Sequence, residues 1–220
     1  MAPQSEWLLN DKAINDYFLL LQQEYPSVHA LPTFFYQRYT RTKDSKENYD
    51  AIKRWTKKVN IFSKSKVFFP INIVEGDFSH WVLVVADMVN KELVYYDSLK
   101  KCYFYECHLK IMEYLVFEHN EKLSKSFPLD DWKQFKGSNP VQNNSIDCGV
   151  FVCTIAEYLS RDAAFNFTQQ NMLAFRKLIA YELTTHKLVK IDVPSNSING
   201  EIHRITCLHL TQKYPNVTFK

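Results

Sequence analysis

Hydrophobic positions recur at helical spacing near the start of the chain. Asn10 or Asp11 is suited to cap a helix that runs up to Tyr25-Pro26. Its apolar side chains fall three or four residues apart, at Ile14, Tyr17, Phe18 and Leu21. Residues 43–58 are polar and rich in lysine, with apolar side chains at three-residue steps, and predict a surface helix that packs by one face.

Three short apolar runs follow and predict a small β-sheet. They span residues 67–74, 81–86 and 92–96. The turn-like segment 87–91 joins the last two runs into one hairpin. Residues 103–119 have helical spacing and are expected to pack on this sheet, and residues 132–135 can add another strand.

The second half of the chain changes in character. After a polar loop, residues 148–159 are hydrophobic almost all round, which predicts a buried central helix. Thr168 can cap a further helix over residues 169–188. We therefore expect a globular body over residues 1–188 and a C-terminal extension of unassigned structure over residues 189–220.

Composition narrows the class of protein. A chain of 220 residues that is 46% hydrophobic suits one compact domain. It has no apolar run near the roughly 20 residues of a membrane span and no secretory pattern at its start. Five cysteines without framework spacing predict reduced thiols inside the cell. The net charge of +3, from 27 basic and 24 acidic residues, does not predict nucleic-acid binding, so we expect neither a membrane nor a nucleic-acid partner.

Cys148 stands where the polar loop meets the buried helix, which places its sulfur at a helix N-terminus. Unpaired N–H groups and the helix dipole favour the thiolate that a nucleophilic cysteine needs. Gly149 beside it permits close backbone approach. Taken alone, a cysteine entering an apolar helix is more often a small core residue, as we expect for Cys153.

Three further residues complete a catalytic pattern around this cysteine. His80 lies at the start of a strand and can serve as a base. Asp97 ends the neighbouring strand, and in a hairpin these two positions lie side by side, so a carboxylate there can orient the imidazole. Gln142 lies six residues before Cys148, where its amide can donate to an oxyanion. Each of these residues, taken alone, could have a purely structural role, but their joint arrangement favours a cysteine protease.

The same stretches resemble the active-site motifs of the Ulp/SENP family of SUMO-specific cysteine proteases. The motifs are His80-Trp81, Tyr95-Tyr96-Asp97-Ser98 and Gln142-Asn143-Asn144-Ser145-Ile146-Asp147-Cys148-Gly149. The resemblance extends to Leu9-Asn10-Asp11, Thr33-Phe34-Phe35, Lys53-Arg54-Trp55-Thr56-Lys57-Lys58-Val59, Asn166-Phe167-Thr168-Gln169-Gln170 and Phe175-Arg176-Lys177. It covers nearly all of residues 7–188.

The resemblance implies an α+β, papain-like fold in permuted His-Asp-Cys order, with the central helix packed on a small mixed sheet. It implies that Cys148 is the nucleophile, His80 the base and then acid, Asp97 the orienter and Gln142 the oxyanion donor. It also implies that the protein cleaves peptide and isopeptide bonds after the diglycine tail of SUMO. No cofactor or metal is expected, and the protein is expected to act as a monomer in the nucleus or at the nuclear envelope.

Substrate-binding residues follow from the same resemblance. Trp81 would roof the tunnel for the diglycine tail, and Arg54 and Lys57 would contribute to a basic docking surface for SUMO. The family places a tryptophan directly before Leu-Asn-Asp, whereas here Leu8 fills that position and Trp7 lies one residue earlier. Either the chain bulges to bring Trp7 back or one tunnel wall is altered.

Four alternatives stay open at this point. The substrate can be another ubiquitin-like modifier, as for deneddylating relatives, although the basic segment favours SUMO. A non-catalytic module that binds ubiquitin-like proteins and an acyltransferase with a similar triad are further readings. The weakest is a zinc site made by Cys102, Cys107 and His108, which lack the paired-ligand spacing of structural zinc modules.

Overall fold

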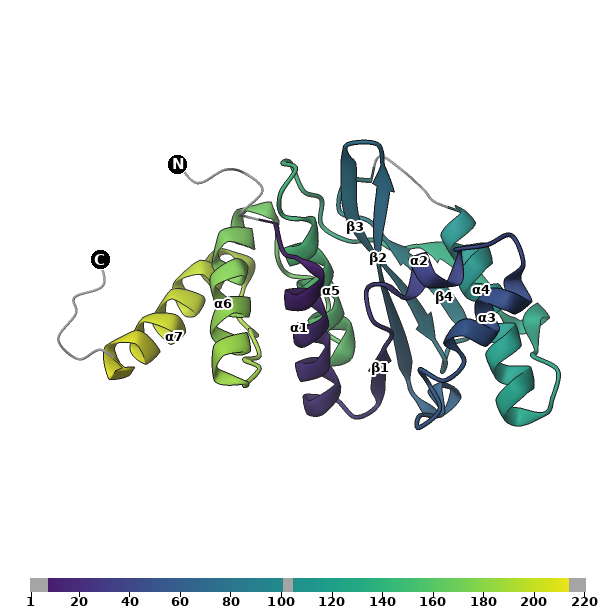
Figure 1. Cartoon of the computed structure of the whole chain (residues 1–220). Coiled ribbons are helices and arrows are strands. Elements are labelled where there is room, and N and C mark those ends of the chain that lie inside the picture. The colour runs from purple at the N-terminus through teal and green to yellow at the C-terminus, as the bar shows by residue number, and fades with distance from the viewer. Residues whose placement is uncertain (1–7, 101–104, 214–220) are drawn as a thin grey trace.

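Residues 8–100 and 105–213 are described in the computed structural model, where helices lie on both sides of a five-stranded sheet (Figure 1). The strands are β1 (Val28–Ala30), β2 (Lys66–Glu75), β3 (Phe78–Asp87), β4 (Glu92–Tyr96) and β5 (Lys133–Lys136). They lie in sequence order across the sheet. The central pairs β2/β3 and β3/β4 are antiparallel, whereas β1 and β5 pair in parallel at the two edges. The predicted α+β class with a small mixed sheet is confirmed.

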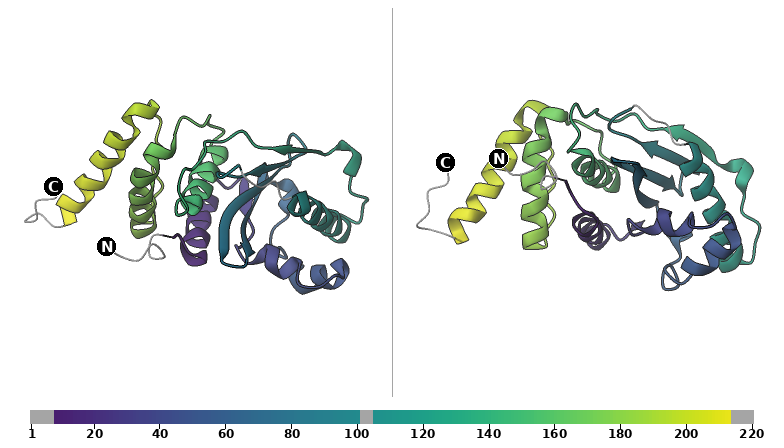
Figure 2. Two further views of the ribbon diagram at one scale, coloured as in Figure 1. Left: turned by 90° about the horizontal axis from the view of Figure 1, so that it is seen from above. Right: turned by 45° about the horizontal axis from the view of Figure 1, so that its top comes forward.

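The helices form two layers. In the described part of the chain they are α1 (Asp11–Glu24), α2 (Phe35–Tyr39), α3 (Ser45–Ile52), α4 (Tyr105–Leu123), α5 (Cys148–Ser160), α6 (Met172–Thr185) and α7 (Ile198–Lys213). Short 3-10 helices are η2 (Ile61–Ser63), η3 (Leu129–Asp131), η4 (Gln169–Asn171) and η5 (Ser195–Ser197). Helices α1 and α5 lie on one side of the sheet with α6 and α7 beyond them, and α2, α3 and α4 lie on the other (Figures 1 and 2). None of these described helices is long and apolar enough to cross a membrane.

Strand β3 explains why one of the apolar runs is almost continuous. Successive side chains of a strand point to opposite faces of its sheet. Leu83 and Val85 enter the core shared with α1 and α5, whereas Val82 and Val84 enter the core beneath α2, α3 and α4. Both faces are therefore buried, and the usual alternation of polar and apolar residues is lost.

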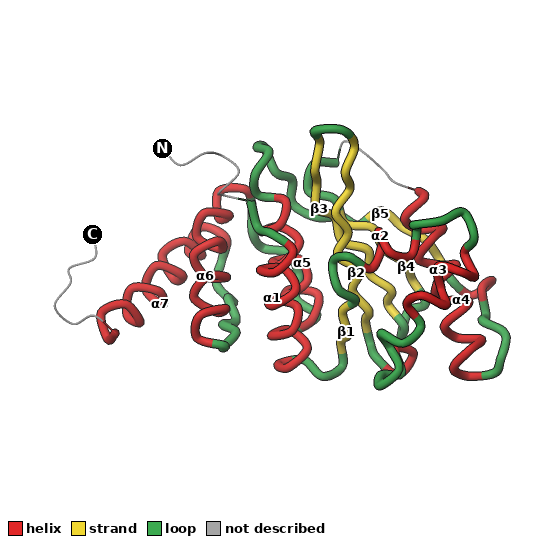
Figure 3. Tube along the Cα trace, viewed as in Figure 1, coloured by secondary structure: helices red, strands yellow, loops and turns green. Residues whose placement is uncertain are grey.

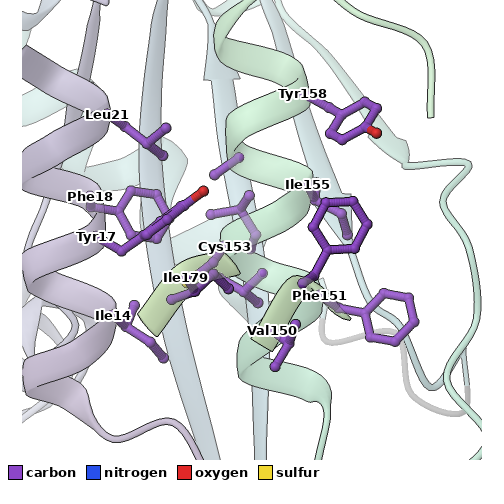
Figure 4. Packing of buried hydrophobic residues seen from close by; sticks show 14 of the residues in the cluster. Ile14, Tyr17, Phe18, Leu21, Val150, Phe151, Cys153, Ile155, Tyr158 and Ile179 are labelled. Atoms are coloured by element: carbon purple, nitrogen blue, oxygen red, sulfur yellow. The ribbon is translucent and has the colours of Figure 1, made fainter. Parts of the chain in front are cut away.

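Helix α5 is the central buried helix that the sequence predicts. Its side chains are buried on nearly every side: Cys153 lies on the side of Tyr17 and Phe18 of α1, whereas Ile155 lies on the opposite side of α5 (Figure 4). Asn10 caps α1 as expected, because its side chain accepts from the backbone N–H of Ala13. The core thus fixes the axis of α5, and with it the position of the first residue of that helix.

Two predictions about strands and helices in the first half need correction. The sheet contains a second hairpin, because β2 and β3 are joined by Gly76 and Asp77. Gly76 has a φ of 58°, which glycine adopts without strain. The expected helix over residues 43–58 ends at Ile52, and turns follow up to residue 58. There Thr56 is buried and donates through Oγ1 to Glu118 of α4, which holds the segment away from a helical path.

The C-terminal region is also more regular than the sequence indicates. The expected helix over residues 169–188 is divided into η4 and α6. Helix α6 ends at Thr185, and the C-cap residue His186 that follows has a left-handed conformation with a φ of 54°. Helix α7 forms where no structure was assigned. Its Ile198 and Ile202 are fully buried in the same core as α5 and α6. The part of the chain from residue 189 to α7 is therefore packed on the rest of the protein through these residues.

Candidate active site

Cys148 is the first residue of α5 and is only 2% exposed. Asp147 precedes it as the N-cap residue, and the Asp147 carbonyl accepts the first helical hydrogen bond from the N–H of Phe151. Gly149 allows the chain before α1 to approach, because a Cβ there would lie 2.9 Å from the Cβ of Leu9. The residues near Leu9 are thereby held against the N-terminus of α5.

His80 and Asp97 come together as the hairpin geometry predicts. The Nε2 atom of His80 lies 2.7 Å from Oδ1 of Asp97, and both side chains are buried. Oδ1 also accepts from the N–H of Leu99 at 2.8 Å, and Nδ2 of Asn139 donates to the Asp97 carbonyl at 3.2 Å. Asp97 is thus fixed through its side chain and its backbone before it orients the imidazole.

The electrostatics of His80 show that the imidazole stands between two partners. Burial alone lowers the pKa of His80, but hydrogen bonds to Asp97 and to the Cys148 thiol outweigh burial and raise it to about 9. Because Nε2 is occupied by Asp97, Nδ1 is the atom left to face the sulfur. Burial likewise raises the pKa of Asp97, but the hydrogen bond from His80 and the N–H of Leu99 bring it below its ordinary value. At neutral pH the pair is an imidazolium and a carboxylate.

Gln142 is buried next to the loop that carries Asp97. Its Oε1 accepts from Oγ of Ser98 at 2.5 Å, and its backbone N–H donates to the Ser98 carbonyl at 2.8 Å. The Nε2 group donates one hydrogen to the carbonyl of Asn144 at 2.6 Å. Ser98 therefore fixes which end of the amide donates, and a second hydrogen of Nε2 is left for another acceptor.

A cleft of about 480 Å³ opens His80 and Gln142 to solvent. It is lined by Leu8, Asp77, Phe78, Ser79, His80, Leu99, Gln142, Asn143, Asn144 and Ser145. The hairpin that carries His80 thus forms one wall, the segment leading to Cys148 another, and the chain before α1 contributes Leu8. The base and the amide donor line this cleft, while the Cys148 thiol is buried behind them and hydrogen-bonds to the base.

The predicted substrate-binding residues are not gathered at the cleft. Trp81 is 5% exposed and belongs to the core cluster that contains Cys148, rather than to the residues that line the cleft. Trp7 lies outside the described residues, while Leu8 is 43% exposed at the cleft. Arg54 and Lys57 are exposed on the turns after α3.

The residues of the zinc alternative are not arranged as a metal site in what the structure describes. Cys107 and His108 are buried in α4, and Cys102 lies outside the described residues. Burial lowers the pKa of His108 to about 4. Within residues 8–100 and 105–213, no three His, Cys, Asp or Glu side chains are grouped to hold a metal ion.

Sequence reasoning missed the residues that grip Asp147. Arg176 and Gln169 both bond to its carboxylate, at 2.6 and 2.8 Å. The sequence did indicate that Asp147 has partners, because a buried aspartate at the start of an apolar helix needs hydrogen-bond donors for its carboxylate. The partners lie more than 20 residues further along the chain, so no local pattern identifies them.

Known proteins are similar to this chain in sequence. The family described as the Ulp1 protease family, C-terminal catalytic domain, matches residues 7–188. Sentrin-specific protease 2 of Rattus norvegicus is 38% identical over 189 residues, and sentrin-specific protease 3 of Homo sapiens is 37% identical over 182. Each match covers 82% of this chain and 30% of the relative, so the chain spans about a third of the length of these proteins.

Solved structures agree. The C-terminal Ulp1 protease domain in complex with Smt3, the yeast ortholog of SUMO, is 28% identical with a TM-score of 0.70, over 84% of this chain and 79% of that one. The SUMO protease Ulp1 with its catalytic cysteine oxidized to a sulfonic acid is 29% identical with the same TM-score, over 81% and 78% of the two chains. The papain-like fold expected from the sequence is confirmed. The chain therefore belongs to the Ulp1 protease family, through the C-terminal catalytic domain of that family.

Proposed function

We propose that this chain is a cysteine protease that cleaves after the diglycine tail of SUMO, both in precursors and in conjugates. The observation that carries the proposal is the buried 2.7 Å contact between His80 and Asp97, with Cys148 as the second hydrogen-bond partner of the imidazole. A thiol, a base and an orienting carboxylate in this order form the arrangement of a cysteine protease. The names of the relatives, which refer to sentrin or SUMO, support the substrate.

The proposed reaction begins with the Cys148 thiolate beside the His80 imidazolium. The sulfur attacks the carbonyl carbon of the last glycine, and a C–S bond forms as the carbonyl oxygen gains negative charge. Nε2 of Gln142 and the backbone N–H of Cys148 donate to that oxyanion. His80 then gives its proton to the leaving amine as the C–N bond breaks, which leaves a thioester on Cys148.

Hydrolysis of the thioester returns the enzyme to its first state. His80, now neutral, takes a proton from a water molecule whose oxygen attacks the thioester carbon. A C–O bond forms, the C–S bond breaks, and the modifier leaves as a carboxylic acid that gives its remaining proton to solvent, while Cys148 is again a thiolate beside an imidazolium. Asp97 holds the imidazole in one orientation through both steps. The amine can belong to a peptide or to a lysine side chain.

Recognition is proposed to combine the cleft with a docking surface outside it. The diglycine tail is proposed to lie in the cleft, with Trp81 packed behind the wall of the cleft. A narrow passage selects glycine, because only residues without side chains fit in it. Arg54 and Lys57 meet the folded modifier. Thr56 between them is anchored to the buried carboxylate of Glu118 at 2.5 Å, so both cations are carried on a fixed segment. Charges placed in this way set orientation and association rate.

The test is a panel of fluorogenic substrates made from SUMO, ubiquitin and a Nedd-type modifier, with Cys148→Ala as the inactive control. We expect turnover of the SUMO substrate to exceed that of the others by at least tenfold. Equal turnover of all three would refute the SUMO assignment, and faster turnover of the Nedd-type substrate would favour the deneddylase alternative. We further propose that the protein is monomeric and acts in the cell at the nucleus or nuclear envelope, which rests on its family alone.

A further inference from the structure

The segment from Gln142 to Asp147 carries one oxyanion donor and leads directly to the other. Gln142 supplies a side-chain amide at its start, and the backbone N–H of Cys148 follows its end. The segment forms neither helix nor strand and connects β5 to α5 as a loop (Figure 3). Because no ladder of backbone hydrogen bonds supports it, its shape depends on the side chains that bond to it.

The carboxylate of Asp147 is held by three donors. Nη2 of Arg176 donates to Oδ1 at 2.6 Å, while Nδ2 of Asn144 and Nε2 of Gln169 donate to Oδ2 at 2.7 and 2.8 Å. Asp147 is 6% exposed. Burial raises the pKa of Asp147, but these hydrogen bonds bring it below its ordinary value, so the side chain is a carboxylate at neutral pH.

The same two outer residues also bond to the backbone of the segment. Nη2 of Arg176 donates to the carbonyl of Ile146 at 3.1 Å, and Oε1 of Gln169 accepts from the N–H of Asn143 at 3.0 Å. Arg176 lies on α6 and Gln169 on η4, so both belong to the helical layer outside α5. That layer therefore binds the Gln142–Asp147 segment both near its beginning, at Asn143, and near its end, at Ile146.

The sulfur of Cys148 is positioned by other means. Cys148 belongs to α5, whose residues from Cys148 to Tyr158 are all buried in the core. Loss of the contacts to Asp147 would free the loop while the packed helix keeps its place. The carboxylate of Asp147 also lies one residue from the oxyanion donor of Cys148, and without its cation it would repel the charge that develops there.

We propose that Arg176 and Gln169 are positioning residues for the oxyanion hole, which act through Asp147 to hold the Gln142–Asp147 segment in place and to neutralise its carboxylate. This inference rests on the proposed function. It predicts that these residues affect steps in which an oxyanion forms. Alkylation of a thiolate by iodoacetamide is a displacement at a saturated carbon and forms no oxyanion, so it reports on the sulfur and His80 alone.

The experiment measures kcat, KM and the iodoacetamide alkylation rate of Cys148 in Arg176→Gln, Arg176→Lys and Gln169→Met, with Arg204→Gln as the control. Arg204 makes an ion pair with Glu201 on the surface of α7, so its change removes the same charge far from the segment. We expect kcat to fall roughly tenfold to a hundredfold in Arg176→Gln, which is no larger than the fall in kcat that removal of one oxyanion donor causes. Arg176→Lys should recover part of it. KM should stay within about twofold of the wild type in every variant, and alkylation should do so in Arg176→Lys and Gln169→Met, which keep the cation beside Asp147.

Two results would overturn the inference: a kcat within twofold of the wild type in a folded Arg176→Gln protein, or alkylation that slows in parallel with kcat in Gln169→Met. If circular dichroism shows that Arg176→Gln is unfolded, Gln169→Met decides, because it keeps the size of the side chain and changes no charge. An unchanged kcat in that variant overturns the inference. The wild type is measured on the same SUMO substrate, and its inactivity would instead refute the proposed function.

Discussion

Replacement of Asp97 by asparagine tests how the site keeps its imidazole charged. In the folded protein the pKa of His80 is about 9, and the hydrogen bond to Asp97 is the largest contribution that raises it against burial. An amide cannot supply that charge, so the pKa of His80 should fall toward or below its ordinary value of about 6.5. A fall of that size corresponds to a lost preference for imidazolium on the order of 3 kcal/mol.

The direction of the pH dependence follows from the active protonation state of His80, which is the imidazolium. The imidazolium persists below the pKa, so the wild type should lose activity as pH rises through about 9. At pH 7.5 about 97% of His80 is protonated with a pKa of 9 and about 9% with a pKa of 6.5. We therefore expect Asp97→Asn to lower kcat at pH 7.5 by at least tenfold and to move the alkaline limb to lower pH, while KM changes little.

The assay is the pH dependence of kcat and kcat/KM on a SUMO substrate between pH 5 and about 10, a range that brackets the titration of His80. Asp87→Asn is the control, because Asp87 ends strand β3, which carries His80, and its carboxylate accepts hydrogen bonds in the exposed turn that follows. It should behave as the wild type. An Asp97→Asn protein that keeps its alkaline limb near 9 and a kcat within threefold of the wild type would refute the role of Asp97.

Three further perturbations separate stability, tail binding and docking. Burial raises the pKa of Glu182 to about 8, so the free energy of unfolding of the wild type is highest below the unfolded pKa near 4.5 and falls as pH rises toward 8. Chemical denaturation should therefore find Glu182→Gln more stable than the wild type by about 4 kcal/mol at pH 8, with almost no difference between the two proteins at pH 4.5. A gap that does not change with pH would contradict this. Trp81→Ala should cost about 3 to 5 kcal/mol of stability and slow SUMO and short diglycine peptides alike, and slowing of SUMO alone would exclude a role at the tail. Reversal of charge at Arg54 and Lys57 should raise KM for folded SUMO several-fold at low salt but spare the peptide, and an effect that persists undiminished at 1 M salt would exclude electrostatic docking.

The parts of this structure that were predictable depend on patterns close in the sequence. The helical spacing after Asn10 locates α1, and the apolar run after Asp147 locates α5. The contact of His80 with Asp97 was predictable because one antiparallel hairpin brings the two strand ends together.

What escaped prediction depends on contacts between distant segments. Helix α7 contains Gly200 and follows Pro194, which weakens its local signal, yet Ile198 and Ile202 are buried in the core with α6. Helices in proteins gain most of their stability from such packing rather than from propensity. The bonds from Gln169 and Arg176 to Asp147 likewise join separate elements, and no spacing in the sequence reveals them.

The most direct measurement of the central claim is covalent capture of the nucleophile by the substrate. SUMO that carries a C-terminal electrophile in place of the scissile bond is incubated with the wild type and with Cys148→Ala, and mass spectrometry of the digest locates the adduct. We predict a single adduct on Cys148 in the wild type, none in Cys148→Ala, and at most weak capture by the matching ubiquitin probe. An adduct on Cys107 or Cys153, or equal capture of both modifiers, would contradict a SUMO protease that acts through Cys148.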